Sequence, residues 1–88
     1  MTTSAELRRL ESELYDILDY DLPPYHQVVS VDANPRRSGG IDLIIIIRFG
    51  VYANPDREEC VRICDRYVES LIRTNHIQDD IYVSVRFK

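Results

Sequence analysis

The segment Ile41–Phe49, IDLIIIIRF, constrains the fold more than any other part of the chain. A β-strand places alternate side chains on opposite faces, so the run Leu43–Ile47 makes both faces of a strand apolar. A continuous apolar run of this length is typical of a central strand with neighbours on both sides. The segment therefore predicts a sheet built around it, and the fold depends on what covers each face.

The chain has 88 residues, which is enough for one small core, and we expect a single compact domain over residues 1–88. Its longest apolar run is far too short to cross a membrane. The first residues, MTTSAELRRLES, lack the apolar segment of a secretory signal, so the sequence favours a cytoplasmic protein. The two cysteines are too few for a disulfide scaffold, which fits a reducing compartment.

Two segments have the 3.6-residue apolar period of amphipathic helices. The first covers residues 3–20 and starts at Thr3-Ser4-Ala5-Glu6, which has the spacing of a capping box. The second is expected to start at Asn54-Pro55-Asp56, with Asn54 as the cap, and to stop near Asn75. Residues 25–33, 41–49 and 80–87 read as strands, and the segment NPRRSGG reads as a hairpin loop between the first two.

These elements follow the order α-β-β-α-β and predict an α+β fold, a two-layer α/β sandwich with a three-stranded sheet. The apolar segment 41–49 is expected in the middle, which gives the strand order 1-2-3 with the last two strands parallel. The order 2-1-3 is the alternative. Both helices are expected to pack on one sheet face, and the alternative places the first helix on the other face.

The sheet face without helices is predicted to be an interface, because it combines an apolar centre with polar margins. A partner protein or a second copy of the chain would cover it. The predicted centre consists of Val28, Ile44, Ile46 and Tyr82, and the predicted margin of His26, Arg48 and Arg86.

Residues 1–24 hold six acidic and two basic side chains, so this segment carries a charge equal to the whole net charge of −4. Glu13, Asp16 and Asp19 lie away from the apolar stripe of the first helix. One interpretation is a solvated face. The other is an acidic surface that docks on a basic groove of a partner, such as one that binds nucleic acid.

A second hypothesis is that the chain associates with nucleic acid. The hairpin carries Arg36 and Arg37 next to Gly39-Gly40, and Arg48, Arg86 and Lys88 supply further positive charge. Phosphate-binding loops lead from a strand into a helix, whereas this loop joins two strands, so a solvated hairpin tip is the competing interpretation. The negative net charge also argues against binding to duplex DNA.

No arrangement of residues indicates catalysis, a cofactor or a metal ion. Cys60 and Cys64 fall inside the apolar stripe of the second helix, where small core residues are expected. His26 and His76 are not accompanied by a nucleophile or a positioned carboxylate in any recognisable spacing.

The sequence thus favours a non-enzymatic protein-binding module that acts by covering a partner's surface. Many small acidic proteins of this size are inhibitors carried by phages and other mobile elements, including anti-CRISPR proteins, and this analogy adds a viral inhibitor to the hypotheses. No motif in the chain resembles a particular family.

Overall fold

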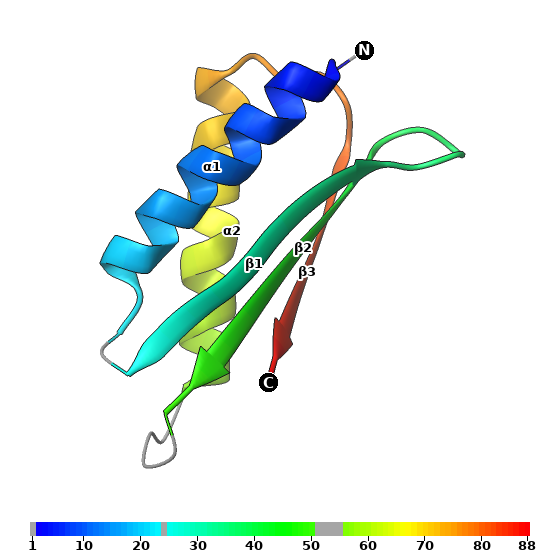
Figure 1. Ribbon diagram of the computed structural model, residues 1–88. Coiled ribbons are helices and arrows are strands. Elements are labelled where there is room, and N and C mark those ends of the chain that lie inside the picture. The colour runs from blue at the N-terminus through cyan, green and yellow to red at the C-terminus, as the bar shows by residue number, and fades with distance from the viewer. Residues whose placement is uncertain (1, 24, 51–55) are drawn as a thin grey trace.

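The computed structural model describes residues 2–23, 25–50 and 56–88. Two helices form one layer and a three-stranded mixed sheet forms the other, as Figure 1 shows. The order α-β-β-α-β and the α+β class are as predicted. The elements are α1 (Ser4–Asp21), β1 (His26–Pro35), β2 (Ile41–Phe49), α2 (Arg57–Thr74) and β3 (Ile81–Phe87).

Both helices begin at side-chain caps that satisfy free backbone N–H groups. At α1, the Glu6 N–H donates to the Thr3 hydroxyl at 3.2 Å, and the Thr3 N–H donates to the Glu6 carboxylate at 3.1 Å, which is the predicted capping box. At α2, the cap is Asp56, which accepts from the Glu59 N–H at 3.1 Å. The helix therefore starts later than predicted, and Asn54 lies outside the described residues.

The strand order is β1-β2-β3, with β1 antiparallel and β3 parallel to β2. The predicted central position of β2 is confirmed, and the alternative order 2-1-3 is wrong. Register pairs such as Val31 with Ile45 and Ile45 with Val85 align the three strands across the sheet.

Both helices pack on the same sheet face, α1 over β1 and α2 towards β3 (Figure 1). The alternative in which α1 covers the second face is wrong. The core between the layers includes the leucines of α1, the odd-numbered residues of β2 and both cysteines of α2. No helix in the described part of the chain is long and apolar enough to cross a membrane.

A bulge in β1 changes which of its residues face the helices. Val28 pairs with Ile47 and Ser30 pairs with Ile46, so Val29 is an extra residue without a partner in β2. Val28 consequently points into the core, like its register partner Ile47, and its side chain is only 2% exposed. The prediction that Val28 lies on the open face was wrong, because a strict two-residue alternation cannot account for a bulge.

The helix layer covers the sheet unevenly. On β1 the inward-facing side chains Val28, Val31 and Ala33 are buried, whereas the side chains of β3 on the same face are all half-buried. The sheet is thus sealed on the β1 side and less completely covered on the β3 side.

Candidate functional site

The open face of the sheet has an apolar centre made by Ile44 and Ile46 of β2. Both are half-exposed, whereas Ile45 between them is buried under the helices. The cross-strand register surrounds these two isoleucines with polar neighbours, namely Ser30 and Asp32 from β1 and Ser84 and Arg86 from β3. The apolar centre is therefore smaller than predicted, because Val28 belongs to the core.

Tyr82 lies at one corner of this face, between Arg36 and Gly40. The guanidinium carbon of Arg36 lies 4.2 Å from the centre of the Tyr82 ring, and the Arg36 Nε lies 3.4 Å from Asp42. On the other side, Gly40 has φ +86, and a Cβ there would come within 2.8 Å of the ring. The tyrosine is thus 49% exposed while two neighbouring residues restrict its ring.

The opposite end of the open face is basic. Arg48 is exposed beside Gln27, and Arg86 is exposed beside Ile46 in the adjacent strand. Lys88 follows directly, and its N–H donates to the carbonyl of Ile47 at 2.9 Å. The predicted margin residues Arg48 and Arg86 thus do border the isoleucines, whereas Arg37 is exposed in the hairpin loop at the far end of the sheet.

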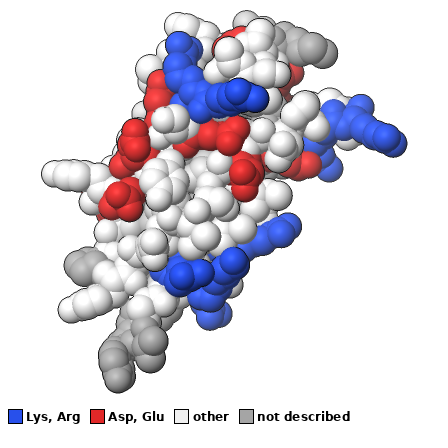
Figure 2. Space-filling view, viewed as in Figure 1, with Lys and Arg blue, Asp and Glu red and all other residues white. Residues whose placement is uncertain are grey.

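Charge is divided between the two layers. Residues 25–50 and 81–88, which include all three strands, hold five basic and two acidic side chains, a net +3, while the rest of the chain carries −7. Figure 2 shows acidic side chains over α1, with basic side chains at the top of the molecule, at the hairpin tip on the right and at the lower end of the sheet. The sheet is therefore the basic part of the molecule and the helix layer the acidic part.

The three predicted acidic residues of α1 do not act as one surface. Glu13 lies towards α2, where it accepts from the Asn75 side chain at 3.4 Å and lies 3.8 Å from Arg9. Asp16 and Asp19 are exposed. Glu13 thus helps to join α1 to the end of α2, and of the three acids only Asp16 and Asp19 are exposed.

A fourth acid of α1 was not singled out from the sequence. Asp21 accepts a hydrogen bond from the Tyr67 hydroxyl, and this bond raises the pKa of Tyr67. It is a second link between the helices.

His26 does not belong to the open face. Its register partner is Phe49, its ring meets Phe49 edge-on with centroids 4.6 Å apart, and its Nδ1 lies 2.8 Å from the carbonyl of Pro23. Phe49 in turn stacks on Phe87 at 5.1 Å. The prediction that His26 borders the open face was wrong for the same reason as for Val28. Both residues precede the bulge, and the extra residue Val29 puts their side chains on the face opposite to the one that strict alternation predicts.

The remaining candidate residues lie in the core. Cys60 and Cys64 are buried, and burial raises the pKa of both thiols, that of Cys64 to about 12. Within residues 2–23, 25–50 and 56–88, no group of three or more His, Cys, Asp or Glu side chains is arranged to hold a metal ion.

Comparison of the chain with protein-family models, with curated proteins and with solved structures found no match. The surfaces of the molecule are therefore the basis for a functional proposal.

Proposed function

We propose that the chain is a non-enzymatic protein-binding module whose open sheet face covers an acidic surface of its partner. The observation that carries the proposal is the half-exposure of Ile44 and Ile46 in the middle of the central strand. Side chains on a strand paired on both sides present a rigid surface, which lowers the entropy cost of binding.

The surroundings of the two isoleucines support this proposal. Tyr82 and Arg86 are residue types that often dominate binding energy at interfaces, and both are exposed on this face. Tyr82 is already ordered by Arg36 and Gly40. The surplus of basic over acidic side chains in the sheet favours a negatively charged partner and speeds the encounter with it.

Covering a partner's working surface would make the module an inhibitor, and its charge pattern suggests two docking regions. The open face would bind acidic groups of the partner, and the exposed Asp16 and Asp19 would meet a basic region. A viral inhibitor, including one of a CRISPR effector, is one protein of this kind.

The test is an Ile46→Arg variant in a pull-down from native lysate. A partner that binds through the open face should be retained by the unaltered chain and lost with Ile46→Arg, while the circular dichroism spectrum stays unchanged. Ser12→Arg is the matched control, because it adds the same charge at an exposed position of α1. Equal retention of the partner by Ile46→Arg contradicts the proposal.

Binding to nucleic acid is the second candidate, favoured by the positions of the basic side chains. Arg48, Arg86 and Lys88 lie at one end of the open face, and Arg37 lies beyond the other end of β2, about 30 Å away for a strand of nine residues. Arg36 contributes less, because Asp42 and Tyr82 already engage it.

The two candidates differ in how binding responds to salt. Affinity for DNA or RNA should fall steeply as salt rises, and an Arg86→Gln variant should show a shallower slope. If neither DNA nor RNA binds at low salt, the nucleic-acid candidate is wrong.

A further inference from the structure

Strand β3 forms an edge of the sheet that no other strand covers in the described part of the chain. Its seven residues pair with β2 in an unbroken register, without a bulge and without proline. The strand is about 24 Å long and regular, which makes it a template for pairing with a further strand.

The backbone groups that face outward on β3 can be assigned from its two ends. The Asp80 carbonyl accepts from the Ile41 N–H at 2.8 Å, and the Lys88 N–H donates to the Ile47 carbonyl at 2.9 Å. Even-numbered residues therefore face β2. Because successive residues of a strand alternate, the N–H and C=O groups of the odd-numbered residues point to the free edge, namely those of Ile81, Val83, Val85 and Phe87.

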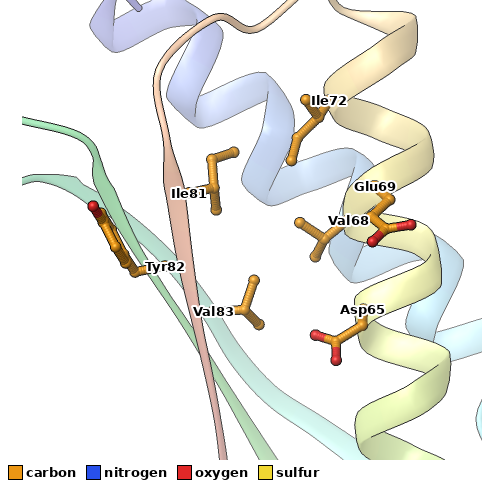
Figure 3. A pocket seen from close by; sticks show the side chains of 7 residues that line it. All are labelled: Asp65, Val68, Glu69, Ile72, Ile81, Tyr82 and Val83. Carbon is orange, nitrogen blue, oxygen red and sulfur yellow. The ribbon is translucent and has the colours of Figure 1, made fainter.

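The side chains of the same four residues are half-buried although they lie on the face that carries the helices. Between α2 and β3 runs an open groove of about 580 Å³, drawn in Figure 3. Val68 and Ile72 of α2 point into it from one side and Ile81 and Val83 from the other, with Asp65 and Glu69 along the α2 margin. A strand added beside β3 would place its own apolar side chains over this groove.

We propose that β3 pairs with β3 of a second copy, antiparallel and about a two-fold axis at Ser84. This register sets Val83 opposite Val85 of the second copy and Ile81 opposite Phe87 of the second copy. All of these residues have outward-facing backbone groups, so each pair exchanges hydrogen bonds. Apolar side chains then meet only apolar side chains on the helix side.

The side chains on the open side of β3 fit a second copy as well. On the open side of the sheet, Arg86 faces Tyr82 of the second copy, a pairing of a cation with an aromatic ring. Helix α2 runs opposite to β3, because Arg57 lies 5.6 Å from the Phe87 ring while Ile72 lines the groove with Ile81. The two-fold axis therefore places the N-terminal half of α2 towards the C-terminal half of α2 in the other copy, and each half carries both acidic and basic side chains.

The backbone edge of β3 is distinct from the apolar centre of the open face, and the two proposals stand separately. Pairing along β3 joins the sheets of two copies edge to edge, brings Tyr82 and Arg86 of the two copies together, and leaves Ile44 and Ile46 of both copies free. The centres of Ile44 and Ile46 would then lie on one continuous surface, which presents the binding site twice.

The mass of the unaltered chain in solution is the first measurement. Light scattering over a wide range of concentrations should show a rise from 10.3 kDa to twice that value. A Val85→Pro variant, which removes one outward-facing N–H, should lose the dimer and keep the circular dichroism spectrum. If Val85→Pro does not fold, slow hydrogen exchange of the Val83 and Val85 amides at high concentration, and fast exchange at low concentration, tests the same pairing.

Cross-linking tests the register. In the proposed pairing Ser84 faces Ser84 of the second copy with Cα atoms about 4.5 Å apart, within the range of a disulfide. Ser84→Cys should form a covalent dimer on mild oxidation. Ser30→Cys is the matched control, since Ser30 is the same residue type, also half-buried on the open face, but on β1. The native cysteines are buried and do not compete.

Three results would overturn the proposal. The first is a mass of one copy at every concentration. The second is covalent dimer formed as readily by Ser30→Cys as by Ser84→Cys, which indicates contact between open faces. The third is an unaltered dimer mass in Val85→Pro. None of these results bears on the pull-down with Ile46→Arg, so failure of one proposal is distinguishable from failure of the other.

Discussion

The two edge strands of the sheet are protected to very different degrees. β1 contains a bulge at Val29, ends at Pro35, and lies beneath α1 with its inward side chains buried. β3 has a regular register and half-buried inward side chains, and a groove separates it from α2. Bulges, prolines and covering helices are devices by which proteins prevent edge-to-edge association.

The difference shows that each edge of this sheet is protected, or left unprotected, by the features of its own strand and the helix beside it. A single helix layer covers both strands, yet only one edge is closed. The unprotected edge is also the one whose sequence is self-complementary in antiparallel pairing. The difference between the two edges is therefore consistent with association of two copies along β3.

The largest expected effect comes from placing a charge at equivalent sites near the two edges. Val28→Asp introduces a carboxylate at a buried position and should lower the free energy of unfolding by more than about 4 kcal/mol, a large part of the stability of a small domain. Val85→Asp lies on the same face of β3 but is half-exposed, so we expect about 2 kcal/mol or less. Urea unfolding followed by circular dichroism measures both, and equal losses would show that the edges are equally covered.

A substitution in the hairpin tests how firmly the start of β3 is held. Gly40→Ala should cost about 2–3 kcal/mol, because φ is +86 and the added carbon would lie 2.9 Å from the Asp80 carbonyl oxygen as well as near Tyr82. Gly39→Ala is the control: φ is +95 but no atom lies within 4 Å, so about 1 kcal/mol is expected. Thermal unfolding compares the two variants. Identical midpoints would mean that the close packing of Gly40 against Tyr82 and Asp80 does not contribute to the cost of the substitution.

Removal of Val29 should remove the bulge with a small loss, within about 1.5 kcal/mol. Val28 and Ser30 already occupy consecutive positions opposite Ile47 and Ile46, so each remaining residue keeps its face. The β1 edge becomes regular, and association at high concentration should increase. Removal of Val31 serves as control: a strand without the bulge then places Ser30 opposite Ile45, in the buried position of Val31, so we expect a larger loss of stability.

The effect of pH is the smallest when it is expressed per pH unit. Below pH 9 the Cys64 thiol is protonated in both the folded and the unfolded chain. Because burial raises its pKa from 9.0 to about 12, only the unfolded chain loses this proton between those values, and stability falls with rising pH. Cys64→Ala should flatten that part of the stability profile by up to about 1 kcal/mol per pH unit. An unchanged slope would mean that burial does not raise the pKa of Cys64 in the folded chain.

Much of the fold could be predicted because several signals agree. The apolar run of β2 required two neighbours, the helical periods were long, and the Thr3–Glu6 box fixed the start of α1. The bulge could not be predicted, because nothing in the sequence around Val28 and Val29 distinguishes an extra residue from a continued alternation. Two of the expected open-face residues, Val28 and His26, were misplaced for that single reason.

The candidate site was predicted in outline but not in detail. Ile44, Ile46, Tyr82, Arg48 and Arg86 share the open face as expected. The contacts that hold Tyr82 were missed, because the expected strand order carried no register and so did not pair Asp42 with Tyr82. The incomplete burial of β3 depends on the distance between α2 and the sheet. The periodicity of apolar residues in a helix does not predict that distance.

The position of β3 has a consequence for synthesis of the chain on the ribosome. The most apolar strand obtains its second neighbour from residues 81–87, which are made last among the described elements. Until they emerge, the nascent chain can form the β1–β2 hairpin but exposes the outer side of β2. That interval is when a holding chaperone would be of most use to this protein, and it lengthens if translation slows between α2 and β3.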